Sequence, residues 1–390
     1  MPTPVPRWQQ FIGVGKEPSW NSLTAATTFF PILASEHVPQ FEDIVDDSFR
    51  GNAAAEQAYY QGVGWSELTW PNMNFYPDDS GVLLMALLGQ DTLTGTARTG
   101  TLNGAISAGA TSIGYTAGTG GAPIIGDIFG IDAGLSTAEQ FTVTAVSGSG
   151  PYTLTIAAPG TRFAHLNTAA MATLFQHALT LNNAAFPPSY TGARFTGLVS
   201  TAEQIGGIYW EELNLKFTNP GRLTLDVKGK GAIQGSVTKP SNVYSSQKIL
   251  LPWQGTLTLG GSANAKLISG NVMLRRVNDQ VFGMANSQNP NASNVSTITV
   301  GGALEFYSQD QTELNYWLNN TQPAASLTWL SDVNALTLQM TKCVFSKGTR
   351  LDFGSAYVRT RATFKGIANN TDGTPGPLKA LAVSARSTGY

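Results

Sequence analysis

The stretch that most constrains the fold of this chain is residues 77–89, with the sequence PDDSGVLLMALLG. Asp78, Asp79 and Ser80 can accept hydrogen bonds from the free amides at a helix start, and the two carboxylates suit the positive end of the helix dipole. Gly89 can adopt the left-handed conformation that ends a helix. The residues between these ends are apolar all round, and the run is shorter than the roughly 20 residues that span a membrane. We therefore predict a short buried helix packed on sheets, because the chain on both sides of it is patterned as β-strands.

The composition is poor in charge. Only 12% of the 390 residues are charged, about half the usual share of roughly 25%. Gly is abundant at 42 residues, and 42% of the residues are hydrophobic. This mix predicts a mainly β protein with many turns and polar, uncharged surfaces. It favours a surface buried in an assembly, where charge would cost desolvation, over an ordinary β-sandwich rich in surface Thr and Ser.

The charges that do occur are unevenly distributed. Residues 36–91 contain ten acids against Arg50 alone, a net charge of −9, whereas residues 341–390 contain eight bases against two acids, a net charge of +6. Regions of opposite sign can pair between subunits and steer assembly, or they can be solvated faces of one monomer. The candidate interface residues are Glu36, Glu42, Asp43, Asp46, Asp47, Arg50, Arg350, Arg359, Arg361 and Lys365.

The strand pattern divides the chain into segments. We predict an N-terminal arm over residues 1–28 that orders only against another molecule, a core over residues 29–95 and 167–368, and a C-terminal tail over residues 369–390. Residues 96–166 are rich in Gly, Ala, Thr and Ser and are predicted to form an inserted small β-barrel. Within it, residues 105–113 are predicted to begin a strand-turn-strand pattern, which residues 126–132, 140–146 and 152–156 continue.

The strands predicted in the core mostly alternate between apolar and polar residues, which indicates antiparallel sheets buried on one face. These strands are predicted over residues 64–70, 174–181, 194–199, 206–217, 222–233, 254–259, 266–277, 296–307, 327–330, 333–345 and 356–365. A second helix is predicted over residues 308–319, capped by Ser308 and Asp310, with Leu314, Trp317 and Leu318 forming a stripe that packs into the core. Residues 36–61 are predicted as an unusually long connection with little periodicity before Tyr59 and Tyr60.

Neither catalytic nor cofactor chemistry is indicated. His37, His165 and His177 have no metal-ligand spacing, and Cys343, the only cysteine, lies in a strand pattern as a buried small hydrophobe. No Ser occupies a nucleophile-elbow sequence between a strand and a helix. We therefore expect no enzyme activity and no cofactor. The N-terminus lacks a signal-peptide pattern and no run is long enough to span a membrane, so we expect synthesis in a cytoplasm.

The order of three features resembles the tail tube proteins of long-tailed, non-contractile bacteriophages. The first is the acidic stretch from Glu36 to Arg50-Gly51, followed by a strand rich in Tyr, Gly and Trp. The second is the Pro-polar-Gly-Leu-Leu-to-Leu-Gly form of residues 77–89. The third is the C-terminal half, in which strands 208–215, 221–227 and 267–274 precede the strand 296–307 and the helix 308–319. The resemblance covers the chain outside residues 96–166.

The resemblance implies a core that is a β-sandwich or barrel with a flanking helix. It also implies a homohexameric ring that stacks into a tube in the virion tail, through which double-stranded genomic DNA passes without specific binding. It implies tape measure, tail tip and tail terminator proteins as partners, and a long loop and terminal arms that bridge rings. We map that loop onto residues 36–64, where it could meet the basic region of the next ring. A basic lumen would hold phosphates, so lumen strands are expected to be neutral or acidic. The insertion 96–166 is expected on the outside of the tube.

Two other interpretations stay open. One is another β-protein of the virion, such as a head–tail connector or a capsid decoration protein, which would form single rings or require a capsid. The other is a carbohydrate-binding or hydrolytic β-protein, suggested by eight Trp residues and Thr/Asn-rich strands. That interpretation requires coplanar exposed aromatics over an acid pair, whereas most of the Trp residues lie inside alternating patterns typical of a core.

Overall fold

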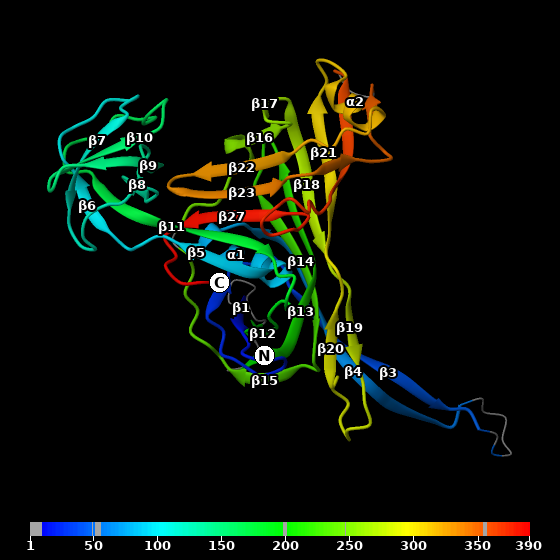
Figure 1. Cartoon of the computed structure of the whole chain (residues 1–390). Helices are drawn as coiled ribbons and strands as arrows, with labels where there is room; N and C mark the ends of the chain where they lie inside the picture. Colours follow the sequence, from blue (N-terminus) through cyan, green and yellow to red (C-terminus); the bar gives the residue numbers. More distant parts are fainter. Residues whose placement is uncertain (1–9, 49, 51–55, 198–200, 246, 354–356) are drawn as a thin grey trace, which may run out of the picture.

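The fold is mainly β, as predicted. The computed structural model describes residues 10–48, 50, 56–197, 201–245, 247–353 and 357–390. Strands make up 51% of it and helices 6%. Figure 1 shows a central body of two large sheets, a separate β-module on one side and a long hairpin that projects from the body on the other. Within the described ranges, no helix is long and apolar enough to cross a membrane.

The first large sheet follows the order β2-β1-β12-β13-β18-β21-β26-β24, with β14, β4 and β3 continuing from one side of β13. Its longest strand, β13, pairs with β12 through its first half and with β14 and β18 through its second half. Its strands are β1 Phe11–Lys16, β2 Thr28–Phe30, β3 Glu36–Asp46, β4 Ala58–Asn74, β12 Tyr190–Phe195, β13 Thr201–Thr218, β14 Thr224–Gly231, β15 Gly235–Thr238, β18 Leu267–Arg275, β21 Thr299–Tyr307, β24 Cys343–Phe345, β25 Arg350–Asp352 and β26 Arg359–Gly366.

The second large sheet follows the order β17-β16-β22-β23-β27-β11, and β5 also pairs with β11. A small hairpin of β19 and β20 lies beyond the end of β18 (Figure 1). These strands are β5 Gly89–Thr94, β11 Ala170–Leu181, β16 Gly255–Leu259, β17 Ser262–Asn264, β19 Asn278–Val281, β20 Ala292–Val295, β22 Ala325–Ser331, β23 Asn334–Met340 and β27 Lys379–Ser384, and a 3-10 turn, η2, covers Pro252–Gln254.

Residues 96–166 form a module with its own core. Its strands follow the order β6-β7-β10-β9-β8, and the start of β11 pairs with both β6 and β8, which closes a small barrel. The strands are β6 Thr99–Leu102, β7 Ser112–Ala117, β8 Ile128–Ile131, β9 Glu139–Ser147 and β10 Tyr152–Ile156. In the strand-turn-strand pattern predicted from residues 105–113, the first strand is reduced to an isolated bridge between Ile106 and His165, and the second is β7, which starts at Ser112. β11 therefore belongs to both the barrel and the body.

The predicted buried helix is α1, Pro77–Leu88. It contacts β13 of the first sheet and β27 and β11 of the second, so it lies in the shared core of the body. Gly89 ends it with φ 95°, as predicted. The predicted capping is confirmed for Ser80, whose hydroxyl oxygen accepts a hydrogen bond from the Tyr76 amide at 3.0 Å, and is wrong for Asp78 and Asp79, which accept hydrogen bonds from Ser245 instead.

The chain on both sides of the predicted core also contributes to the body. Phe11–Lys16, predicted within an arm, is β1 and pairs with β12 and β2. Lys379–Ser384, predicted within a tail, is β27 and pairs with β11 and β23. Tyr390 is buried against α1, where its hydroxyl donates to the Pro77 carbonyl and its ring fills the space that a Cβ at Gly81 would need. Both segments are short, and their strand patterns are too brief to stand out between Gly, Pro and Ser.

The second helix, α2, is shorter than predicted and is turned the other way. It covers Thr312–Leu318. Trp317 and Leu318, predicted as core, are 38% and 60% exposed, and the residue that points inward is Glu313. Glu313 is fully buried and forms an ion pair with Lys266 at 2.7 Å. Trp317 and Leu318 are therefore surface residues, and the covered face of this short helix carries the Glu313 ion pair and Tyr316, which packs against the core and stacks on Phe345.

Candidate assembly surfaces

The β3–β4 hairpin projects from the body as a two-stranded ribbon (Figure 1). In its outer part Ile44 pairs with Tyr60 and Val45 pairs with Tyr59. Neighbouring residues of a strand point to opposite faces, so each face of the ribbon carries one aliphatic and one aromatic side chain. All four side chains are exposed. Because an isolated two-stranded ribbon is marginally stable in water, this surface favours contact with another molecule.

The structure corrects the prediction for residues 36–64. Most of this segment is strand rather than loop, with β3 and β4 in antiparallel register from Glu36 opposite Thr69 to Asp46 opposite Ala58. The register shifts between Phe41 and Asp43, as in a β-bulge. The bulge and the exposure of both faces remove the apolar alternation that marks a half-buried strand. Residues 49 and 51–55 lie outside the described residues.

Six of the candidate interface residues, five acids and Arg50, lie in the segment of the β3–β4 hairpin, and they differ in whether their charges are paired. Arg50 forms an ion pair with Asp46, and Asp43 accepts a hydrogen bond from the Tyr59 hydroxyl. The hydroxyl of Ser48 also donates to Asp46 and lowers the pKa of that carboxyl. Within the described chain, no ion-pair partner lies near the exposed carboxylates of Glu36, Glu42 and Asp47. The hairpin therefore carries unneutralised negative charge beside uncovered apolar side chains.

The other four candidate interface residues, Arg350, Arg359, Arg361 and Lys365, lie on β25 and β26. Arg359 forms an ion pair with Glu305 at 2.9 Å, and Arg361 forms one with Asp352 at 3.1 Å. The hydrogen bond from Arg359 lowers the pKa of Glu305. Arg350 and Lys365 are exposed, and no carboxylate of the described residues lies within ion-pair distance of either.

The acidic and basic candidates are not brought together within one copy. The β3–β4 hairpin extends to one end of the molecule, whereas α2 and the adjoining start of β26 lie at the opposite end (Figure 1). That opposite end also exposes apolar side chains, namely Trp317, Leu318, Phe353 and Tyr357. A single chain thus presents two chemically complementary surfaces that cannot reach one another.

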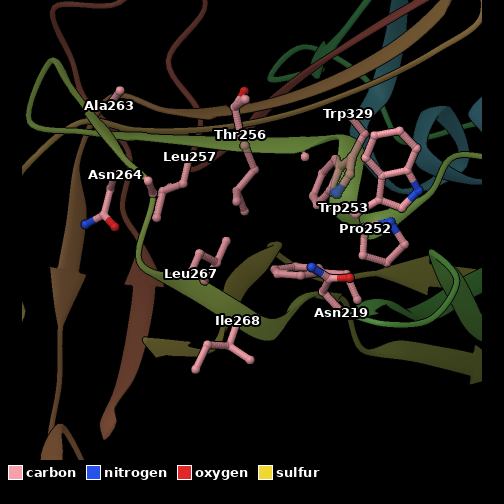
Figure 2. A pocket seen from close by; sticks show the side chains of 14 residues that line it. Asn219, Pro252, Trp253, Thr256, Leu257, Ala263, Asn264, Leu267, Ile268 and Trp329 are labelled. Carbon is pink, nitrogen blue, oxygen red and sulfur yellow. The ribbon is translucent and has the colours of Figure 1, made fainter. Parts of the chain in front are cut away.

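Figure 2 shows a cavity at the open edge of the body, where β16 and β17 face the start of β18. Its volume is about 310 Å³. Trp329 is buried at one end of it, and Trp253, which is 63% exposed, forms part of the rim. The polar residues among its lining are uncharged, for example Asn219 and Asn264. The lining therefore offers neither a general acid or base nor a nucleophile activated by one, and it lacks the acid pair that a glycosidase requires.

The histidines and the cysteine are integrated into the fold. Each histidine is buried and hydrogen-bonded; the partners are Trp70 for His37, Asp132 and Glu139 for His165, and Asp91 for His177. Burial, and secondarily the charge of Arg194, lowers the pKa of His37 to about 3. Cys343 is buried as predicted, and burial raises the pKa of its thiol to about 12. In the part of the chain that the structure describes, no group of three or more His, Cys, Asp or Glu side chains is arranged to hold a metal ion.

The sequence analysis missed Arg276, which is buried at the end of β18. A signal for it was present: Val272, Leu274 and Arg276 recur at every second position, and residues at that spacing point to one face of a strand. The first two are core residues, so the same alternation assigns Arg276 to the buried side of the sheet.

Comparison with known proteins gives one family. A family model described as "Phage tail tube protein" matches residues 8–380. The match runs through the body and the inserted barrel and includes every strand and helix described above except the last four residues of β27. No curated protein matches the chain.

Proposed function

Because this chain belongs to the phage tail tube protein family, we propose that its copies form homohexameric rings that stack into the tube of a long, non-contractile phage tail. The family makes the protein a structural component of the tail. The finer proposal includes the passage of double-stranded DNA through the bore and contacts with tape measure, tail tip and tail terminator proteins. Synthesis in the host cytoplasm is part of the same proposal.

The observation that carries the proposal is the uncovered β3–β4 hairpin. Its exposed Ile44, Val45, Tyr59 and Tyr60 lie beside free carboxylates, and the described residues of their own chain leave them uncovered. Cationic and apolar side chains that could receive the hairpin of another copy lie on the body of the molecule, along β25 and β26 and at the α2 end (Figure 1). Contact between two different surfaces of identical copies is heterologous, and it repeats indefinitely when it does not close into a ring. Such a contact suits the stacking of rings along a tube.

The charge pairing on the body supports a conduit that releases its cargo. On the solvent face of β13 and β14, three lysines each lie beside a carboxylate; the pairs are Lys216 with Asp226, Lys228 with Glu212 and Lys230 with Glu211. A protein binds DNA largely through cations that neutralise phosphates and release counterions. Lysines that already have carboxylate partners contribute little to that effect, so we propose that this face lines the bore.

Electron microscopy of the purified full chain, concentrated at low salt, tests the proposal. We expect rings with sixfold symmetry and hollow tubes, with the β13–β14 face toward the bore. Assembly is expected to weaken as salt is added, because the Debye length is only about 10 Å at 0.1 M ionic strength. Single rings that never stack would favour a head–tail connector. Monomers that stay dispersed after tail tip proteins are added would overturn the proposal.

A further inference from the structure

A second, larger hollow lies beside the end of β18. It is a groove of about 910 Å³, bounded by the loop that follows β11, by the segment that joins β20 to β21, and by the residues that follow β26. Its apolar lining includes Phe186, Ile298 and Pro377. Two cations, Arg276 and Lys365, also line it, and none of its lining residues is acidic.

Arg276 is the unusual group in this groove. Its side chain is only 6% exposed, and its Nε is buried without a hydrogen-bond acceptor. Only its backbone amide is engaged, donating to the Glu211 carbonyl at 2.8 Å. In the described parts of the chain no carboxylate lies within ion-pair distance of the guanidinium. Burial lowers the pKa of Arg276. A buried cation without a partner is costly, so this geometry indicates an acceptor supplied from outside the chain.

The hairpin of another copy has the matching chemistry. Glu42 and Asp47 are exposed carboxylates without an ion-pair partner among the described residues, and Ile44 and Val45 lie between them. A ribbon that combines aliphatic side chains with free acid complements a groove that combines aliphatic side chains with free cations. The hairpin points away from the body of its own chain (Figure 1), so the occupant is a second copy.

We propose that this groove receives the outer part of the β3–β4 hairpin of a second copy, with a hairpin carboxylate pairing with Arg276. The inference rests on the proposed self-assembly and specifies where the hairpin docks. It selects the groove over the α2 end because Arg359 and Arg361 are already neutralised there by Glu305 and Asp352, which leaves the exposed Arg350 as the one candidate arginine there without a carboxylate partner among the described residues, whereas Arg276 is buried without one. Arg276 and Lys365 have no such partners within the described residues.

Disulfide trapping between full-length copies tests the docking. The native Cys343 is buried, so only the introduced surface cysteines are accessible for disulfide formation between copies. One chain carries Asp47→Cys, and the other carries Thr297→Cys on the exposed rim of the groove. We expect a disulfide-linked heterodimer when the two are mixed under assembly conditions and oxidised. The matched control replaces Thr297→Cys with Arg350→Cys at the opposite end of the first sheet, and no link is expected there.

Charge variants give a second readout. Arg276→Gln, and separately Glu42→Gln with Asp47→Asn, should each raise the concentration at which assembly begins by roughly tenfold, and combining them should add little more. Lys365→Gln should act in the same direction, and because Lys365 is exposed it tests the groove if Arg276→Gln fails to fold. Glu36→Gln, at the base of the hairpin, is the control and should change little.

The two levels of the proposal fail in different ways. If wild-type copies assemble but the hairpin cysteine links to Arg350→Cys instead of Thr297→Cys, the groove is not the receptor and self-assembly stands. If the groove variants assemble like the wild type, the inference is likewise overturned. If wild-type copies never associate, the proposed function and the docking both fall.

Discussion

At the start of α1, Asp79 is a half-buried carboxyl next to a second one, Asp78. Burial, and then the charge of Asp78, raises the pKa of Asp79 to about 6 from its ordinary 3.8. The Ser245 amide donates to Asp79 at 3.2 Å, which opposes the rise without cancelling it. The folded chain therefore holds a proton here that the unfolded chain has already lost.

This difference predicts a pH effect on stability. Between about pH 4 and pH 6 the folded state binds more protons than the unfolded state, so the free energy of unfolding falls as the pH rises through that window. Asp79→Asn keeps an acceptor for Ser245 and removes the charge. It should raise the melting temperature at pH 8, leave it unchanged near pH 4 and flatten the dependence between them.

Thermal melts of both proteins from pH 4 to pH 8 make the comparison. Asp279→Asn is a suitable control because Asp279 is exposed on β19, and it should give the same pH dependence as the wild type. An equal gain at pH 4 and pH 8 for Asp79→Asn would show that the carboxylate charge is not what limits stability there.

Among the elements, the hairpin can be separated from the body. The pairs beyond Glu42 expose their side chains and lie outside the main buried cluster. Replacing residues 43–61 with an Asn-Gly turn should therefore leave the melting temperature of the body unchanged, because a two-residue turn can close the remaining strands. The same change should abolish assembly at concentrations at which the full chain assembles.

Sedimentation and thermal melting measure the two effects. A milder variant, Ile44→Ser with Tyr60→Ser, keeps the strands and should weaken assembly to an intermediate degree. The matched control is Met284→Ser, which alters a fully exposed apolar side chain outside the hairpin. Assembly that survives the shortening of the hairpin would remove this element from the contact.

The elements also show what could be predicted from sequence. α1 was predictable because its signals are local: an apolar run, an acidic start and Gly89 at the end. The strands of the body were predictable where one face is buried, as in β14, whose alternation is regular. The mainly β fold follows from those two patterns.

The errors occur where a distant partner decides the outcome. Glu313 is on the buried face of α2, where it pairs with Lys266. Lys266 lies 47 positions earlier in the sequence, so the local pattern around the helix does not indicate this partner. β27 is a strand because it pairs with both β11 and β23, which are distant in the sequence. For the candidate surfaces, the acidic hairpin was found by charge, whereas the internal pairing of Arg359 and Arg361 required the packing of β26 against β21.

On the scale of the whole molecule, the barrel is joined to the body at few places. Lys248 bridges them, because it forms an ion pair with Asp332 at 3.0 Å and donates to the Gly134 carbonyl at 3.2 Å. Ala138 packs with Val333 in a small shared cluster. These contacts, together with β11, fix the orientation of the barrel without making it part of the main core. We propose that it decorates the outside of the tube, where its bulk leaves the bore open.

Removing the barrel tests this arrangement. The two ends of the segment to be removed are close together, since a Cβ built on Gly95 would lie 3.1 Å from the Leu174 carbonyl oxygen. A short Gly/Ser linker can therefore replace residues 96–173. We expect tubes with an unchanged bore and a smaller outer diameter in electron micrographs. The loss of the shared contacts should lower the free energy of unfolding by about 1–3 kcal/mol. A changed bore would place the barrel inside the tube wall instead.

The position of β27 links the order of synthesis to the exposure of strand edges. β27 lies between β11 and β23, and it follows every other described strand along the chain. Until residues 379–384 have been made, both neighbours keep an open edge, and open strand edges pair readily with other chains. A nascent chain is therefore at its most vulnerable to aggregation just before this strand arrives. A chain truncated before residue 379 is therefore expected to leave the edges of β11 and β23 uncovered and to aggregate.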